Sequence, residues 1–123
     1  MPDVLRERHG VAVLVSDPDG PVLATTEAVL DLIGAAAFGG AEMVAVPVAR
    51  LDPHFFSLGT GFAGEIMQKF VNYRLRLAVV GDISAHLAGS GALRALVAES
   101  NRHDHVWFVP DLAVLDARLA ASA

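Results

Sequence analysis

Short apolar runs and stretches of helically spaced apolar residues alternate along the chain, and Gly or Pro residues separate most of them. Two runs at residues 4–8 and 11–16 flank His9-Gly10, a pattern typical of a hairpin of two antiparallel strands. Three later runs have the length and aliphatic content of buried strands. They cover residues 43–48, 75–80 and 106–109.

Helical spacing fills the segments between these runs. Apolar residues recur with a helical period from Thr25, where Thr25 or Thr26 can cap a helix, and Gly39-Gly40 ends the pattern. The first helix is therefore expected between these two points. A second helix is predicted at residues 62–73.

Two further helical stretches follow toward the C-terminus. Residues 84–100 have helical spacing that is interrupted at residues 89–91, where a serine can cap a fresh start. Pro110-Asp111 opens a terminal helix, because proline is tolerated in a first turn. The element order is ββαβαβαβα, and such alternation implies right-handed crossovers and a mainly parallel sheet after an initial antiparallel hairpin. The sequence therefore predicts one small α/β domain over residues 1–123.

Composition and charge narrow the class of protein. The 54% hydrophobic content of the 123 residues exceeds the ~45–50% of typical globular domains, which makes a homo-oligomer a candidate assembly. No apolar run approaches the ~20 residues of a membrane span, and charged residues stand near the start, where a signal peptide needs apolar ones. The chain has no Cys, and its net charge of −5 argues against binding a nucleic-acid backbone. We therefore expect a cytoplasmic protein without membrane or nucleic-acid partners.

A glycine pattern precedes the second helix. Gly59, Gly61 and Gly64 spell G-x-G-x-x-G, and Asp82 follows at the distance of a ribose-binding acid. The context does not fit a dinucleotide site, because residues 49–58 separate the first glycine from the preceding strand. We expect instead that Gly59 and Gly61 turn the chain into the helix, and that Gly64 lets the helix pack closely on the sheet. No nucleotide or other cofactor is predicted.

The second helix divides into two faces at 100° per residue. The apolar face, expected against the sheet, comprises Phe62, Ile66, Phe70 and Tyr73. The polar face comprises Glu65, Gln68, Lys69 and Asn72. Glu65 and Lys69 are expected to form an i,i+4 ion pair. The polar face is either an ordinary solvated surface or one that recognises a protein partner.

The string FFSLGTGFAGEIMQKFVNYR at residues 55–74 is the most specific feature of the sequence. Together with ESN at residues 99–101 and VWFVPD at residues 106–111, it resembles a family of small bacterial proteins catalogued as a domain of unknown function, family 4180. The likeness extends over nearly the whole chain. The family name implies no activity.

More remotely, the element order and the junction before the second helix are similar to the STAS domain, the fold of anti-sigma factor antagonists. In those antagonists a serine in a D-S-x-G-type turn opens the second helix, and its phosphorylation by a partner kinase switches off binding. The resemblance implies that Thr60-Gly61 occupies the Ser-Gly position, although Leu58-Gly59 replaces the acid that normally precedes the serine. It therefore implies a STAS-like fold and a phospho-switch at Thr60. Independently of the resemblance, a phosphate on Thr60 or Ser57 would lie in the favourable partial charge at the start of the second helix.

Two functional hypotheses follow from these observations. The first is a non-enzymatic regulatory module that binds a protein through the start of the second helix. Its residues are Ser57, Thr60, Gly61, Glu65, Gln68, Lys69 and Asn72. The alternative is a small binding protein or enzyme that holds an anionic ligand in the turn at residues 58–64. Its residues are His54, Gly59, Thr60, Gly61 and Asp82.

No catalytic residue and no metal site are assigned. His103 and His105 point the same way if their segment is extended, but two ligands do not make a site. A third ligand from His54 has no supporting sequence spacing. Capping of the following helix explains Asp82 as well as a catalytic role does.

Overall fold

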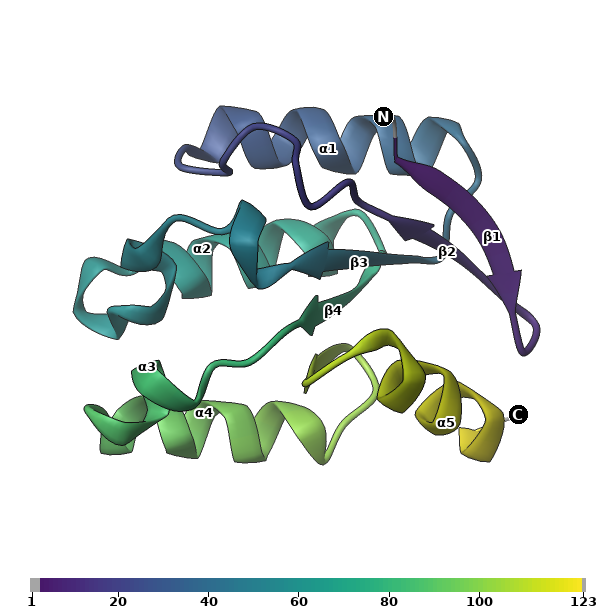
Figure 1. Ribbon diagram of the computed structural model, residues 1–123. Coiled ribbons are helices and arrows are strands. Elements are labelled where there is room, and N and C mark those ends of the chain that lie inside the picture. The colour runs from purple at the N-terminus through teal and green to yellow at the C-terminus, as the bar shows by residue number, and fades with distance from the viewer. Residues whose placement is uncertain (1–2, 123) are drawn as a thin grey trace.

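Residues 3–122, which a computed structural model describes, form a five-stranded sheet with helices on both faces (Figure 1). The strands lie side by side in chain order, β1-β2-β3-β4-β5. They are β1 (Val4–Arg8), β2 (Val11–Val15), β3 (Met43–Pro47), β4 (Arg76–Val80) and β5 (Val106–Val109). The β1–β2 pair is antiparallel and all the other neighbouring pairs are parallel. The predicted α/β class with an initial hairpin is therefore confirmed.

The hairpin turn consists of two residues with positive φ. His9 has a φ of 51° and Gly10 a φ of 84°. This combination is that of a type I′ turn, whose twist matches the right-handed twist of the flanking strands. The turn places Arg8 opposite Val11 and so sets the register of the whole pair.

The described residues contain five α-helices and three short 3₁₀ helices. The α-helices are α1 (Thr26–Phe38), α2 (Phe62–Asn72), α3 (Ser84–Ala88), α4 (Gly91–Asn101) and α5 (Leu112–Ser122). The 3₁₀ helices, which the sequence pattern does not predict, are η1 (Val48–Arg50), η2 (Pro53–Phe56) and η3 (Leu58–Thr60). Of the two threonines that could cap α1, Thr25 does so, and Ser90 caps α4 as predicted, each through its side-chain oxygen. No helix within residues 3–122 is both long and apolar enough to cross a membrane.

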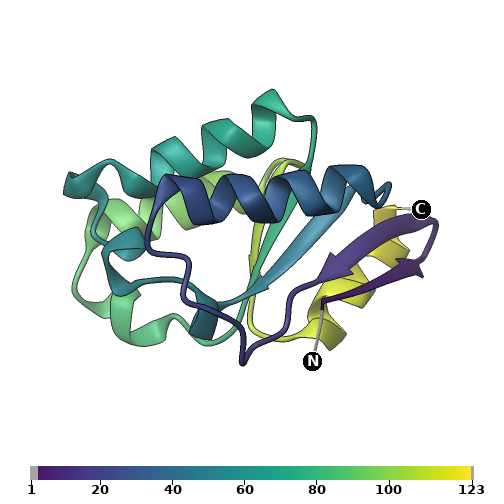
Figure 2. The same ribbon diagram turned by 90° about the horizontal axis from the view of Figure 1, so that it is seen from above.

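The helices divide unequally between the two faces of the sheet (Figures 1 and 2). Right-handed crossovers that all run in one direction place α1, α2 and α4 on the same face. Their buried side chains, including Ile33, Phe70 and Leu93, form the larger core cluster. Leu115 and Leu119 of α5 belong to a smaller cluster on the opposite face.

A side chain from α4 closes the outer edge of β5, the last strand of the described sheet. The Asn101 amide donates to the carbonyl oxygen of Phe108 at 3.2 Å and accepts the N–H of the same residue at 2.8 Å. Exposed strand edges invite pairing with other chains, and this contact blocks one such position. It also gives Asn101, part of the ESN string, a structural role.

Two expectations for α2 are wrong. Tyr73 is 54% exposed, because α2 ends at Asn72 and Tyr73 no longer follows the helical path. Gly64 is exposed, and a Cβ built on it meets no atom within 4 Å, so close packing on the sheet does not require glycine there. The rest of the expected apolar face is buried, namely Phe62, Ile66 and Phe70.

Candidate functional site

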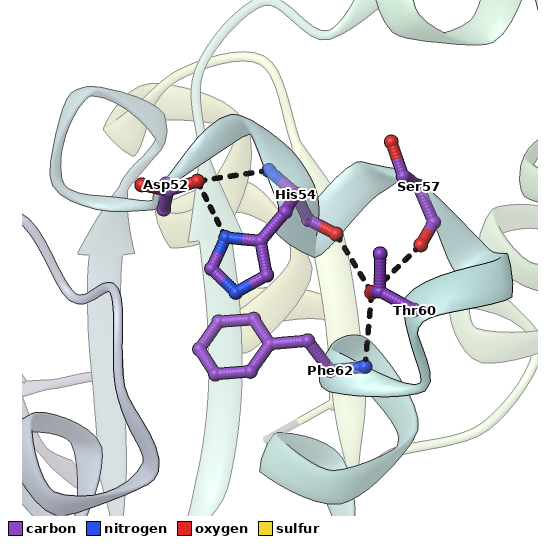
Figure 3. Close-up of polar contacts among 5 residues, drawn as sticks. All are labelled: Asp52, His54, Ser57, Thr60 and Phe62. Carbon is purple, nitrogen blue, oxygen red and sulfur yellow. Dashed lines mark hydrogen bonds and ion pairs between the residues drawn. The ribbon is translucent and has the colours of Figure 1, made fainter.

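The candidate site is the segment from Asp52 to Phe62, which connects β3 to α2 through η2 and η3 (Figure 3). We call it the Thr60 turn. Phe55, Phe56 and Phe62 are buried, and the rings of Phe55 and Phe62 meet edge-on with 6.4 Å between their centroids. These buried aromatic side chains fix the backbone that carries the polar residues of the turn.

Asp52 and His54 form a hydrogen-bonded pair at the start of the turn. The Asp52 carboxylate accepts the backbone N–H of His54 at 3.1 Å, and its Oδ1 lies 2.5 Å from His54 Nδ1. The His54 ring lies over Phe62, with 4.0 Å between the ring centroids. The hydrogen bond from the His54 ring, followed by that from its backbone, lowers the pKa of Asp52. Asp52 therefore stays ionised at neutral pH and fixes the orientation of the imidazole.

Thr60 connects η2, η3 and α2 through one exposed hydroxyl. Its Oγ1 lies 2.9 Å from the carbonyl oxygen of Ser57 and 3.1 Å from that of His54, and its single proton is donated toward these two acceptors. The same oxygen accepts the backbone N–H of Phe62 at 3.2 Å. Gly61 follows with a φ of 77°, a conformation that favours glycine, so this part of the glycine prediction is confirmed.

Ser57 and Gly59 are also exposed in this turn. The Ser57 side chain makes no capping hydrogen bond to η3. A Cβ on Gly59 would meet no atom within 4 Å. Ser57 is thus an accessible hydroxyl, whereas packing does not explain the glycine at position 59.

The polar residues of α2 are held differently from the expected arrangement. Glu65 accepts a hydrogen bond from the Thr26 hydroxyl of α1 at 2.6 Å. No ion pair joins Glu65 to Lys69 within residues 3–122, so that expectation is wrong. Gln68 donates to Asn72 at 2.9 Å, and both side chains are exposed.

Asp82 lies outside the Thr60 turn. Its carboxylate accepts the backbone N–H of Ser84, the first residue of α3, at 2.9 Å, although the N-cap position itself is Ile83. Hydrogen bonds from the Ser84 side chain and then its backbone lower the pKa of Asp82. Asp82 lines a hollow of about 230 Å³ with Phe108 and other residues at the carboxyl ends of β4 and β5. No hydrogen bond or ion pair joins Asp82 to His54 among the described residues.

The remaining histidines do not assemble a metal site in the described part of the chain. His103 is exposed, and its Nε2 lies 3.1 Å from Oε1 of Glu99. Burial lowers the pKa of His105, and the nearby Arg76 charge lowers it further. No group of three His, Cys, Asp or Glu side chains within residues 3–122 is placed to hold a metal ion.

Sequence reasoning missed two contacts that shape the site. One is the Asp52–His54 pair, which the Asp-Pro start of η2 signals as a helix cap. The other is the stacking of His86 of α3 on Phe56, with 4.1 Å between centroids and 15° between planes. The second contact has no local sequence signal, because the two residues come from different elements.

Comparison with known proteins identifies the family. A family model described as Domain of unknown function (DUF4180) matches residues 8–119. The chain belongs to this family. No curated protein and no solved structure matches the chain. The DUF4180 match contains the complete Thr60 turn and α2, so the candidate site lies within the family domain.

Proposed function

We propose that this DUF4180 protein is a regulatory module that binds a protein partner through the start of α2 and is controlled by phosphorylation of Thr60. The observation that carries the proposal is the position of the Thr60 hydroxyl. It is exposed, it donates into the preceding turn, and it accepts the first amide of α2.

A phosphate on Thr60 would alter the turn and not only its charge. Esterification removes the hydroxyl proton, so the hydrogen bonds toward the Ser57 and His54 carbonyl oxygens are lost. The added negative charge is favourable beside the N-terminus of α2, where amide groups give partial positive charge. The turn would therefore reorganise around a phosphate held by the helix start.

Ser57 is the second acceptor in this proposal. Its exposed side chain does not cap η3, so its esterification would add charge without removing a capping hydrogen bond. The structure therefore favours Thr60 over Ser57 as the residue whose modification changes the shape of the surface.

The partner surface we propose is the exposed face of α2 beside the turn. Gly64, Gln68 and Asn72 are exposed on it, and Val71 is 45% exposed. The open space over Gly64 lets a partner backbone approach the helix closely. Glu65, bonded to α1, serves in this proposal to hold the helix in place.

Phosphosite mapping combined with affinity capture tests the proposal. Mass spectrometry of the protein from the cells that make it should locate phosphate on Thr60. Wild type and Thr60→Ser should retain a common partner that Thr60→Asp and Gln68→Arg lose. Retention of every specific partner by Thr60→Asp would refute the switch, and retention by Gln68→Arg would refute the assigned surface.

The anionic-ligand alternative rests on fewer groups. Asp82 lies outside the Thr60 turn, and the backbone N–H of Phe62 already donates to Thr60 Oγ1. Free first-turn amides of α2 remain available to an anion. A rise in melting temperature with inorganic phosphate, lost in Gly61→Ala, would favour this alternative over the protein switch.

We place the module in the cytoplasm, because a regulatory protein without Cys suits a reducing compartment. We also keep self-association as a separate hypothesis. Phe38 at the end of α1 is 96% exposed, and light scattering of wild type against Phe38→Ser tests whether it joins two copies.

A further inference from the structure

The two ring nitrogens of His54 have different surroundings. Nδ1 lies 2.5 Å from Asp52 Oδ1, whereas Nε2 has no hydrogen-bond partner within residues 3–122. The His54 side chain is 35% exposed, and its Nε2 is not one of the buried atoms without a partner, as the Nε2 of His105 is. A carboxylate therefore holds one nitrogen of the ring, and solvent reaches the other.

Three more histidines of the described chain lack this arrangement as well. His103 meets the Glu99 carboxylate through Nε2, so its pairing is the reverse of that in His54. The rings of His9 and His86 form no hydrogen bond to any side chain in residues 3–122. Within this part of the chain, only His54 combines a carboxylate on Nδ1 with an open Nε2.

The Asp52 contact determines the tautomer of the neutral His54 ring. An ionised carboxylate can only accept hydrogen bonds, so the ring proton lies on Nδ1 and the lone pair of Nε2 stays free. A carboxylate bonded to Nδ1–H also makes the imidazole more basic and stabilises positive charge that develops on the ring. His54 Nε2 is therefore a nucleophile that Asp52 orients and activates.

The contacts around the ring hold it in one position (Figure 3). The ring lies over Phe62, with 4.0 Å between the centroids and 31° between the planes. The backbone N–H of His54 donates to Asp52 at 3.1 Å, which fixes the carboxylate as well. Phe62 is the first residue of α2, so the ring lies beside the positive end of a helix dipole, where added negative charge is favourable.

We propose that His54 accepts a phosphoryl group on Nε2. The donor is a nucleoside triphosphate held by a partner kinase. The lone pair of Nε2 forms the N–P bond while the bond from phosphorus to its bridging oxygen breaks, and the nucleoside diphosphate leaves with that electron pair. The Nδ1 proton stays in the hydrogen bond to Asp52, whose charge balances the positive charge of the ring.

This acceptor is separate from Thr60, and the chemistry of the two phosphates distinguishes them. The N–P bond of phosphohistidine breaks in acid and survives alkali, whereas the ester of phosphothreonine survives acid. Protein from the cells that make it should therefore carry on His54 a phosphate that brief acid treatment removes. Thr60→Val should keep this phosphate, and His54→Gln should lose it while any phosphate on Thr60 remains. Either proposal stands if the other fails.

Phosphoramidate, a small donor that phosphorylates histidine and releases ammonia, tests the Asp52 contact on the full chain. At pH 8, above the ordinary histidine pKa of ~6.5, His54 should react faster than the exposed His9 and give only the Nε2 product after alkaline digestion. Asp52→Asn replaces a charged hydrogen bond by a neutral one, so it should slow the reaction of His54 about fivefold and give a mixture of Nδ1 and Nε2 products. His103→Gln is the matched control and should leave the rate at His54 unchanged.

Three results would overturn the proposal. Absence of an acid-labile phosphate on His54 in protein from the cells that make it excludes this residue as the acceptor. Reaction of wild-type His54 at Nδ1 contradicts the tautomer that the Asp52 contact imposes. Equal rates and products for wild type and Asp52→Asn exclude activation by Asp52, provided that circular dichroism shows the variant to be folded.

Discussion

Replacing Asn101, the last residue of α4, by Ala should destabilise the protein. The Asn101 side chain bonds to both backbone groups of Phe108, at 3.2 and 2.8 Å. Phe108 itself is only 7% exposed and lies on the last strand of the described sheet. Without the amide, the N–H and the carbonyl oxygen of Phe108 lose their partner together.

The magnitude follows from the number of groups left unpaired. Each buried polar group without a partner costs about 1 to 3 kcal/mol. Water reaches the edge of β5 more easily than the centre of the sheet, so we expect a total loss of about 2 to 4 kcal/mol. A chain of this size has a stability of roughly 6 to 18 kcal/mol, so the loss is a large fraction of the total. Asn101→Asp keeps the acceptor and loses the donor, and should fall between wild type and Asn101→Ala.

Urea denaturation followed by fluorescence measures the effect directly. The single Trp, Trp107, is 1% exposed and lies next to Phe108, so its emission reports exposure of this strand. Asn72→Ala is the matched control, because Asn72 is exposed on α2 and should change stability by less than about 0.5 kcal/mol. Equal midpoints for Asn101→Ala and Asn72→Ala would refute the assigned role of Asn101, as would unchanged hydrogen exchange at the Phe108 amide.

Three further predictions concern Thr60, Asp52 and two glycines. Thr60→Val should lose about 1 kcal/mol of stability in urea denaturation while Thr60→Ser stays near wild type, because valine makes none of the hydroxyl hydrogen bonds of Thr60. Equal losses in the two variants would contradict this. The pKa of Asp52 is lowered in the folded state. The stability that its ionised carboxylate contributes is therefore fully present above the unfolded pKa of 3.8 and is lost as the pH falls through the folded pKa. Stability should therefore fall more steeply on acidification in wild type than in Asp52→Asn, and parallel curves would exclude the His54 contact as the cause. Gly64→Ala should stabilise the protein by about 0.5 to 1 kcal/mol and raise its melting temperature. Gly20→Ala should not raise the melting temperature, because the new Cβ would lie 2.6 Å from a guanidinium nitrogen of the buried Arg50.

Elements with a regular period or an explicit cap were predictable from the sequence. Thr25, Ser90 and His9-Gly10 each mark a boundary that the structure shows at the expected place. The segment between β3 and α2 has neither a helical nor a strand period, and its three 3₁₀ helices were therefore not visible. In this segment the Asp52-Pro53 pair was a sequence signal for the start of a helix, because it begins η2.

Side-chain partners across the fold were less predictable than the elements. Local spacing favoured Lys69 as the partner of Glu65, but the Thr26 hydroxyl, distant in sequence, takes that carboxylate. A helical wheel also continued through Tyr73, although the helix ends one residue earlier. Both errors have the same physical origin: a period describes one element, whereas its neighbours and its end depend on the tertiary structure.

The topology explains why the candidate site is a connecting turn and not a crevice in the sheet. The parallel strands β2 to β5 are added in one direction, so the sheet lacks the reversal of strand order at which α/β domains usually form a ligand crevice. The Thr60 turn instead presents its polar groups where the chain passes from β3 to α2, on the face that α1, α2 and α4 cover.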